Sequence, residues 1–425
     1  MKDKLPIKVI ISAGPGRLHL IQSAVELKKV DVDVKVITGW IPGKMFSDSF
    51  VDWMGGWVGR KNNLAHALKK RNPAELERSE LKSCGIAEFF IQFLFLLSKF
   101  KLISRNKSAL IGWTAFGLQS KKYIKNADIF HVRGGAGAGG VFAYAKNKNM
   151  KVIVDYSIAH PNELSNQIEK SINKTGANFN KYISLHPKDT FWKMVLRSCD
   201  FADMLVVNSD YVKWSFIKEG YPEHKIKVVY WGVNSEFNIQ KQIYYSTSQI
   251  RLIFTGAFGL RKGAGLIIAA LTELKNRNID FTFDIVGSVT GEISIPRWMQ
   301  VSPNIVFHGH LSQDKMKSIL LASDIYIFPT YTEGCAQSVK EAMSVGLPVI
   351  TTRQSGVPII HKVDGWLIDD DSIEALISAI LELSNNPDLR QRIGSQAAKT
   401  IKLNHTWEIY AKNMKSVYYD LLNDE

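Results

Sequence analysis

Two successive series of apolar segments, each alternating with loops and helix-like stretches, constrain the fold of this chain more than any other feature. The first series begins at residues 8–12 and the second at residues 251–255, with a polar stretch at 239–249 between them. Strands and helices that alternate in this way build parallel sheets covered by helices. We therefore predict an α/β protein with two Rossmann-like, doubly wound domains that face a cleft. A chain of 425 residues is long enough for both.

The same pattern predicts where the domains begin and end. We place the first domain at residues 1–240, with a helical, basic insertion at about 41–120, and the second domain at 241–405. Helical periodicity at 407–422 predicts one more helix at the C-terminal end. The strict alternation of residues 30–37 puts Asp31 and Asp33 on the solvent face of a strand. We therefore do not interpret these two acids as a metal-binding pair.

The stretch 328–350 carries the strongest functional pattern. Glu333 and Glu341 lie eight residues apart, after a strand-like run at 324–329 and before a helix end marked by Gly346 and Pro348. Glu333 is thus predicted in a strand-to-helix loop, at the sheet edge where α/β proteins bind ligands, and Glu341 within the helix. Carboxylates so placed could accept hydrogen bonds from the hydroxyls of a sugar and of a ribose. The alternative is an acid that only favours the helix dipole.

A second loop offers positive charge. The strand at 251–255 leads into a glycine-containing loop that ends in Arg261 and Lys262, directly before a helix. A strand, such a loop and a helix N-terminus together form an anion site. Two adjacent cations at a helix start oppose the helix dipole, so an anionic ligand explains them better than a purely structural role.

The pattern around the two glutamates resembles the donor-binding signature of retaining GT-B glycosyltransferases of family GT4. The residues that carry this resemblance are Glu333, Glu341, Ala342, Met343, Gly346, Pro348, Val349, Ile350 and Gly356. It covers most of residues 204–425 and only scattered positions of 1–200. The resemblance implies a GT-B arrangement in which residues 406–425 form a helix that crosses back onto the first domain. It also implies sugar transfer from a nucleotide-sugar to an acceptor hydroxyl with retention, a hexosyltransferase-type activity of class EC 2.4.

The resemblance also implies a role for each matching residue. Glu333 would bind the hydroxyls of the donor sugar and Glu341 the ribose, while Arg261 and Lys262 would hold the diphosphate. Ala257 stands where the family commonly has an arginine, and Arg261 would supply that charge. The remaining predicted donor-binding residues are Gly14, Gly16, His310, Gly334, Cys335, Ala336 and Gln337.

His160 follows a strand of the first domain, at a position similar to the family's cleft histidine. The resemblance implies that it lies over the transferred sugar, so His160 and Glu333 are the predicted catalytic residues. A loop histidine satisfied by backbone groups is the alternative. No acids or histidines have the spacing of metal ligands, so we expect a metal-independent enzyme without a cofactor. The pattern leaves open whether the donor carries UDP, GDP or ADP.

Positive charge is concentrated near the N-terminus. Residues 1–125 carry 22 Lys and Arg against 10 Asp and Glu, a net +12 of the total +14. Such a field predicts an anionic partner for residues 44–125. The apolar run at 86–97 is too short to span a bilayer. It would lie in the interface of an anionic membrane, or else form a buried core helix. No nucleic-acid-binding module is visible, so we do not expect nucleic acid as the partner.

These features also predict where the protein works and on what. Three cysteines without paired spacing indicate a reduced compartment, and the start at Met1 leads straight into a strand, as expected without a signal peptide. We expect a cytoplasmic protein, peripheral on the cytosolic face of a membrane if the interfacial alternative holds. The acceptor would then be a glycan or lipid-linked glycan of cell-surface polysaccharide or lipopolysaccharide biosynthesis.

A rival prediction comes from a glycine-rich loop in mid-chain. Gly135, Gly137 and Gly140 satisfy G-x-G-x-x-G between a strand and a helix, and Asp155 ends the next strand. That is the arrangement of a dinucleotide fingerprint, so an NAD-dependent oxidoreductase is the alternative function. It would leave Glu333, Glu341 and the two loop cations without a purpose. A non-catalytic binder of sugar nucleotides or nucleic acid ranks lower still.

Overall fold

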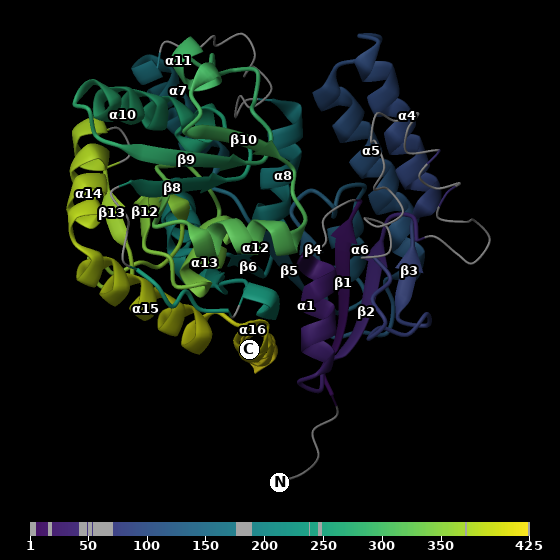
Figure 1. The fold of residues 1–425 in the computed structure, drawn as a ribbon. Coiled ribbons are helices and arrows are strands. Elements are labelled where there is room, and N and C mark those ends of the chain that lie inside the picture. Colours follow the sequence, from purple (N-terminus) through teal and green to yellow (C-terminus); the bar gives the residue numbers. More distant parts are fainter. Residues whose placement is uncertain are drawn as a thin grey trace.

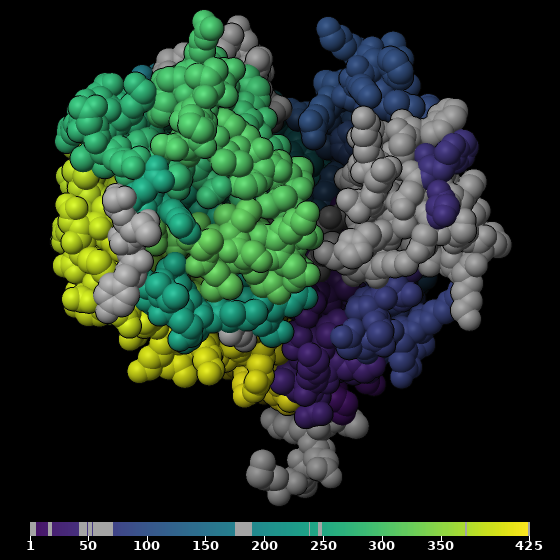
Figure 2. Space-filling view, in the orientation of Figure 1, coloured from purple at the N-terminus to yellow at the C-terminus, as the bar shows by residue number. Residues whose placement is uncertain are grey.

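The protein folds into two lobes, each built on a parallel sheet (Figure 1). The structure, a computed structural model, describes residues 6–15, 19–41, 49, 53, 71–175, 189–237, 239–244, 249–369 and 372–423. In the space-filling view a furrow separates the C-terminal lobe from the N-terminal one (Figure 2). The predicted fold class, an α/β protein with two doubly wound domains, is confirmed.

The N-terminal sheet has seven strands in the order β3-β2-β1-β4-β5-β6-β7. All neighbours pair in parallel, with Lys8 opposite Asp33 and Val9 opposite both Val34 and Ile129. The strands are β1 (Lys8–Gly14), β2 (Asp33–Thr38), β3 (Leu81–Ser83), β4 (Ile129–Arg133), β5 (Lys151–Tyr156), β6 (Met204–Val207) and β7 (Ile226–Val228). The helices are α1 (His19–Lys28), α4 (Gly85–Lys99), α5 (Arg105–Ser120), α6 (Val141–Lys146), α7 (Pro161–Thr175), α8 (Thr190–Phe201) and α9 (Asp210–Ile217).

The C-terminal sheet has six parallel strands in the order β10-β9-β8-β11-β12-β13. These are β8 (Ile250–Thr255), β9 (Phe281–Val286), β10 (Ile305–Gly309), β11 (Ile325–Phe328), β12 (Val349–Thr352) and β13 (Trp366–Ile368). The helices are α10 (Ala264–Asn276), α11 (Arg297–Val301), α12 (Gln313–Ala322), α13 (Gln337–Ser344), α14 (Ile373–Asn385), α15 (Pro387–Asn404) and α16 (Trp407–Asn423). In both sheets the strand order reverses beside the first strand, which is where such sheets bind ligands.

The last helix leaves the C-terminal lobe and packs on the first domain, as the family resemblance implied. Tyr410, Met414 and Tyr418 of α16 belong to the apolar cluster formed by β1, β2 and α1. The hydroxyls of Tyr410 and Ser23 lie 2.8 Å apart and join α16 to α1. This burial links the two ends of the chain across the domain boundary.

The structure corrects two local predictions. The insertion predicted as helical at 41–120 contains β3, which extends the sheet beside β2 before the helices α4 and α5 begin; of its first part, 42–70, only Ser49 and Trp53 are described. The strand expected at 30–37 begins at Asp33, because Asp31 lies in a turn with a φ of 60°. The strand β3 was not predicted, because its three residues are too few to show a recognisable alternation in the sequence.

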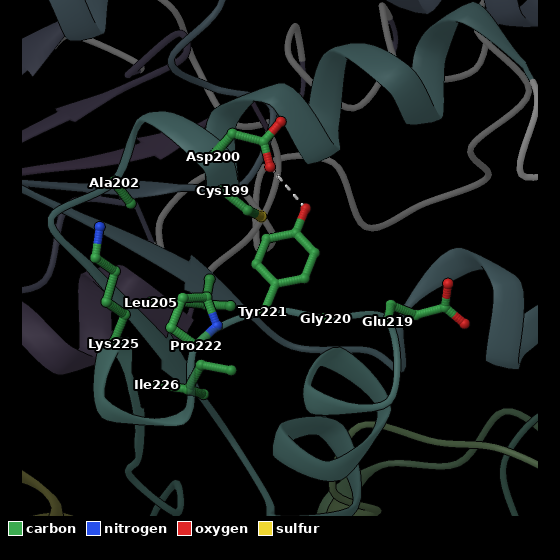
Figure 3. Close-up of a pocket in the computed structure, with 10 residues that line it drawn as sticks. All are labelled: Cys199, Asp200, Ala202, Leu205, Glu219, Gly220, Tyr221, Pro222, Lys225 and Ile226. Atoms are coloured by element: carbon green, nitrogen blue, oxygen red, sulfur yellow. Dashed lines mark hydrogen bonds between the residues drawn. The ribbon is translucent and has the colours of Figure 1, made fainter.

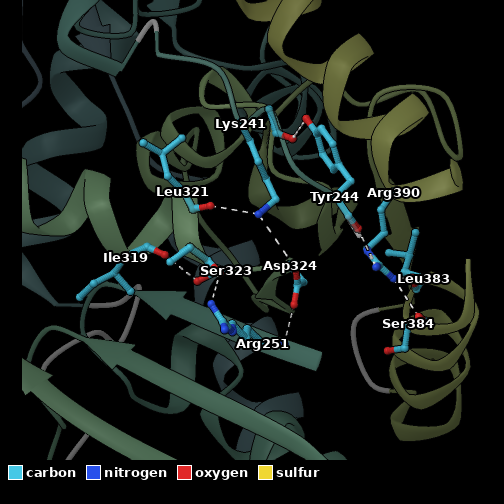
Figure 4. Close-up of polar contacts among 12 residues, drawn as sticks. Lys241, Tyr244, Arg251, Ile319, Leu321, Ser323, Asp324, Leu383, Ser384 and Arg390 are labelled. Atoms are coloured by element: carbon cyan, nitrogen blue, oxygen red, sulfur yellow. Dashed lines mark hydrogen bonds and ion pairs between the residues drawn. The ribbon is translucent and has the colours of Figure 1, made fainter. Parts of the chain in front are cut away.

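The segment between the two domains is fixed by a buried polar network (Figure 4). Arg390 of α15 is fully buried and donates to the main-chain oxygens of Leu383, Ser384 and Tyr244. Lys241 donates to the main-chain oxygen of Leu321 at 3.0 Å. Because a buried cation without partners is costly, these carbonyls tie residues 241–244 to the C-terminal lobe.

Candidate active site

The loops after β8 and β11 meet at the edge of the C-terminal sheet. Residues 260–262 form a single 3-10 turn, η6 (Leu260–Lys262), and Gly263 follows with a φ of 79°. A Cβ on Gly263 would lie 2.0 Å from the carbonyl oxygen of Pro329, so only glycine allows this approach. The hydroxyl of Thr330 and the amide of Tyr331 both donate to the carbonyl oxygen of Arg261. The two loops are thus held as one unit.

This approach brings Arg261, Lys262 and Glu333 together. Arg261 Nη1 and Lys262 Nζ each lie 2.8 Å from Glu333 Oε1. Burial raises the pKa of Glu333, but the charges of Arg261 and Lys262 outweigh it and hold the pKa below its ordinary value. From the sequence, Glu333 was predicted to bind the sugar and the two cations the diphosphate. In the structure they form one ion cluster, which can exchange contacts with an incoming anion.

The main chain from Glu333 to Ala336 is fixed from two sides. Glu333 N donates to Gln354 O and Ala336 N donates to Ser355 O, each at 2.9 Å. Both acceptors lie in η7 (Arg353–Ser355), which follows β12. The main-chain amide of Ala336, one of the predicted donor-binding residues, is therefore already hydrogen-bonded within the second domain.

Gly334 lies against the first domain. Its carbonyl oxygen accepts a hydrogen bond from Ser209 Oγ, and a Cβ on Gly334 would lie 2.0 Å from Ser157 O. Two further predicted residues lie beside it: the buried thiol of Cys335, whose pKa is raised by burial, and Gln337, whose amide donates to Gly232 O. The loop that carries Glu333 is therefore also one of the contacts between the lobes.

Glu341 lies in α13, within the helix as predicted. Its carboxyl group makes no hydrogen bond or ion pair with the described residues. Burial raises its pKa to about 7, although the charge of Lys340 opposes the shift. Lys340 itself is buried and donates to Trp231 O at 2.6 Å. A largely buried carboxyl group without a partner is a site for a ligand that can donate hydrogen bonds.

The raised pKa of Glu341 predicts how stability depends on pH. The folded-state pKa of about 7 exceeds the ordinary value of 4.5, so the folded protein binds the extra proton between these values. Its contribution is fully present below pH 4.5 and is lost as pH rises through 7, by roughly 3 kcal/mol at most. We expect Glu341→Gln to remove this loss. Urea unfolding of both proteins at pH 5 and 8 measures it, and equal pH dependence in the two would contradict the assignment.

His160 lies directly before α7 and is buried. Its amide donates to Ser215 Oγ, its Nδ1 accepts from Asn162 N at 3.3 Å, and its ring meets Phe216 edge-on at 5.1 Å. Burial lowers the pKa of His160, which favours the neutral ring with its proton on Nε2. The structure gives it no contact with Glu333, so its catalytic role stays a prediction.

The other predicted positions are spread along the sheet edges. Gly14 ends β1 with a φ of 67°, and a Cβ there would lie 2.9 Å from the Trp113 ring. Gly16 lies outside the described residues. His310 follows β10 at the far edge of the C-terminal sheet and is exposed, without a hydrogen bond to a described residue.

Sequence reasoning missed a histidine–carboxylate network in the first domain. Asp155 is buried, with Oδ1 3.1 Å from His19 Nε2 and Oδ2 3.8 Å from His131 Nε2. Burial would raise the pKa of Asp155, but the two histidines lower it well below its ordinary range. Tyr418 of α16 lies 2.8 Å from His131 Nδ1, so the network reaches the crossover helix. The sequence shows no common pattern for the three residues, since Asp155 lies near the end of β5, His131 in the middle of β4 and His19 at the start of α1.

This network uses the acid that the rival prediction needed. Because Asp155 is held by His19 and His131, it is not free to bind a ribose. The glycines of 135–140 have packing reasons instead, since a Cβ on Gly137 would meet the Phe142 ring at 1.8 Å and one on Gly139 would meet Thr114 O at 2.9 Å. The geometry therefore gives the oxidoreductase alternative no support.

A separate cavity of about 430 Å³ lies in the first domain, between the end of α8 and the chain before β7 (Figure 3). Cys199 and Tyr221 line it, and the Tyr221 hydroxyl donates to Asp200 at 2.8 Å. Burial raises the pKa of the Cys199 thiol far above its ordinary value. A thiol held neutral in this way is a poor nucleophile, so we assign no chemistry to this cavity.

Within the described residue ranges, no helix has both the length and the apolar character that spanning a bilayer requires. No three His, Cys, Asp or Glu side chains in the same ranges are grouped as metal ligands would be.

Comparisons with known proteins agree with this geometry. The family described as Glycosyl transferases group 1 matches residues 236–400. An uncharacterised glycosyltransferase of Methanocaldococcus jannaschii is 29% identical over 227 residues, which are 52% of this chain and 60% of that protein. The amylovoran biosynthesis glycosyltransferase AmsK of Erwinia amylovora is 30% identical over 180 residues, 40% of this chain and 44% of its own length. The matches thus span about half the length of these relatives.

Among solved structures, Anabaena HepE in complex with UDP and glucose has a TM-score of 0.60 with this chain. The superposition covers 97% of this chain and 100% of HepE at 13% identity. Similarity at this level establishes the fold that the two share.

Proposed function

We propose that this protein transfers a sugar from a nucleotide-sugar to an acceptor hydroxyl with retention at the anomeric carbon. The match of residues 236–400 to the glycosyl transferases group 1 family and the GT-B fold of the chain support this proposal. The observation that carries the proposal is the cluster of Glu333, Arg261 and Lys262 at the contact between the lobes. It offers an acceptor for sugar hydroxyls and two cations for a diphosphate, side by side.

Each member of the cluster has a role in this proposal. Arg261 and Lys262 bind the diphosphate and stabilise its growing charge as it departs. Glu333, ionised because its pKa is lowered, accepts hydrogen bonds from the sugar. Glu341 accepts the ribose hydroxyls, which also gives its carboxyl group the partners that it lacks. The acceptor oxygen attacks C1 on the face that the phosphate leaves, and a phosphate oxygen takes the acceptor proton.

A donor screen tests this proposal. UDP-, GDP- and ADP-sugars are incubated with wild type and Glu341→Gln, with and without EDTA, and release of nucleoside diphosphate is followed. HepE was solved with UDP, so UDP-sugars come first. We expect release from one donor, insensitive to EDTA, because Arg261 and Lys262 are proposed to neutralise the diphosphate. Silence from every donor, with thermal stabilisation by NADH, would retire the proposal in favour of an oxidoreductase.

The acceptor is proposed to be a glycan or lipid-linked glycan of a cell-surface polysaccharide. The match to AmsK, a protein of amylovoran biosynthesis, supports this class of acceptor. So does one face of α4 and its C-cap residue, on which Ile86, Phe93 and Phe100 are 79%, 54% and 66% exposed. The adjoining exposed cations are Lys99, Lys101, Arg105 and Lys107. An apolar face beside cations fits the surface of an anionic membrane, at which a lipid-linked acceptor would be met.

Vesicle binding tests the membrane part. We expect the protein to sediment with phosphatidylglycerol vesicles at low salt, and Phe89→Ser with Phe93→Ser to weaken binding about tenfold or more, since two buried rings are lost. Phe201→Ser, at another exposed ring at the end of α8, serves as the control. Binding that is unchanged in the double variant would disprove the assignment of this face.

A further inference from the structure

A second cavity, of about 430 Å³, lies between the two lobes. Its first wall is formed by α7 and α9, with Gln167, Tyr211 and Trp214 among the lining residues. Its second wall is η7 and the chain after it, including Arg353 and Gln354. None of the site residues predicted from sequence lines it.

Direct contacts connect this cavity to the Glu333 cluster. Gln354, which lines the cavity, accepts the amide hydrogen of Glu333 at 2.9 Å. Tyr211 donates its hydroxyl to Thr332 Oγ1 at 3.2 Å, and Thr332 O accepts from Arg261 Nη1 at 2.8 Å. An occupant would therefore touch Gln354, whose main-chain oxygen holds the Glu333 amide, and Tyr211, whose hydroxyl holds the neighbouring Thr332.

The cavity combines aromatic surface with polar groups. Trp214 is 48% exposed, and its ring lies at 19° to that of Tyr211 with centroids 6.0 Å apart. Gln167 donates to Glu163, but its Oε1 is buried and accepts no hydrogen bond from the described residues. The exposed guanidinium of Arg353 makes no ion pair with them.

The balance of charge limits what the cavity can bind. Glu163 is neutralised by Lys218 at 2.9 Å, and Asp210 accepts from Tyr230 at 2.9 Å. Arg353 is the remaining cation among the lining residues. A phosphate would be disfavoured there, because the carboxylates of Glu163 and Asp210 also line the cavity. Buried polar atoms such as Gln167 Oε1 would disfavour a hydrocarbon chain. A sugar fits both limits, because its C–H face packs on an aromatic ring while its hydroxyls form hydrogen bonds.

We propose that this cavity is a saccharide subsite that holds one sugar unit of the acceptor glycan. The sugar packs on Trp214 and donates to Gln167 Oε1 and Asp210, while Arg353 donates to its oxygens. This inference rests on the proposed function, since the acceptor is defined by that reaction. Because both lobes line the cavity, a bound glycan also favours their contact.

Saturation-transfer NMR with maltose, cellobiose, lactose and mannobiose tests the subsite. We expect at least one disaccharide to bind wild type, and Trp214→Ala and Arg353→Ala each to weaken it about tenfold or more, as loss of a pocket anchor does. Trp214→Phe keeps an aromatic face and should restore most of the affinity. Phe201→Ala, at an exposed ring outside the cavity, should bind like wild type. Thermal unfolding verifies that each variant is folded.

The outcomes separate this inference from the function on which it rests. If wild type releases nucleoside diphosphate from a donor but binds none of the four disaccharides, or binds them equally in Trp214→Ala, the subsite is wrong and the transferase stands. If disaccharide binding depends on Trp214 while no donor is hydrolysed, the cavity is a saccharide site and the proposed reaction is wrong.

Discussion

Glu333→Gln is expected to lower kcat/KM for sugar transfer by about a hundredfold to a thousandfold, the range found when one preorganised polar group at a reaction centre is removed. The amide keeps the size of the side chain but loses the charge that Arg261 and Lys262 contact at 2.8 Å. The two partly buried cations then lie side by side without an anion, so stability should fall by about 2 kcal/mol. Initial-rate kinetics with the donor found in the screen, and urea unfolding, measure the two effects.

A nucleoside diphosphate distinguishes this explanation from simple damage to the fold. Because its phosphates supply the missing negative charge, it should raise the melting temperature of Glu333→Gln by more than that of wild type. Glu292→Gln, a change at an acid outside the cluster, provides the control. A kcat/KM within tenfold of wild type would show that the carboxylate does not act on the reacting sugar.

Gly334→Val is expected to reduce transfer about a hundredfold or more by keeping the lobes apart, since a displacement near 1 Å at a reaction centre has this effect. A Cβ at this position would lie 2.0 Å from Ser157 O and 2.8 Å from Asn208 Nδ2, both in the first domain. Both groups lie at the sheet edge of the first domain, so this steric clash is relieved when the lobes move apart. Nucleotide affinity should change less than transfer, because the ion cluster lies within the second domain.

Small-angle X-ray scattering with and without nucleotide measures the separation of the lobes in Gly334→Val. Ser209→Ala is the matched control, because it removes the hydrogen bond to Gly334 O without adding volume. We expect this control to retain transfer within about tenfold, the size of one neutral hydrogen bond. Full activity in Gly334→Val would mean that this contact is not part of the active arrangement.

Much of the fold was accessible from local pattern. Fully buried strands such as β11 appear as continuous apolar runs, and loops that carry glycine and charge mark the ends of strands at one sheet edge. The strand β3 was missed, because three residues at a sheet edge carry no periodicity that could be recognised. The crossing of α16 was implied only by family resemblance, since helical periodicity does not say which domain a helix covers.

The sequence by itself determined the two doubly wound domains and the residue types at the candidate site, because strand burial and loop chemistry are local properties. Only the tertiary structure decided which of these residues contact one another. Glu333 meets Arg261 and Lys262 across about 70 residues of chain, Asp155 meets His19 rather than a ribose, and Gly334 meets Ser157 of the other lobe. Such contacts depend on how loops from separate strands converge. The convergence fixes the distances between charged side chains, and the strength of their interaction depends on those distances.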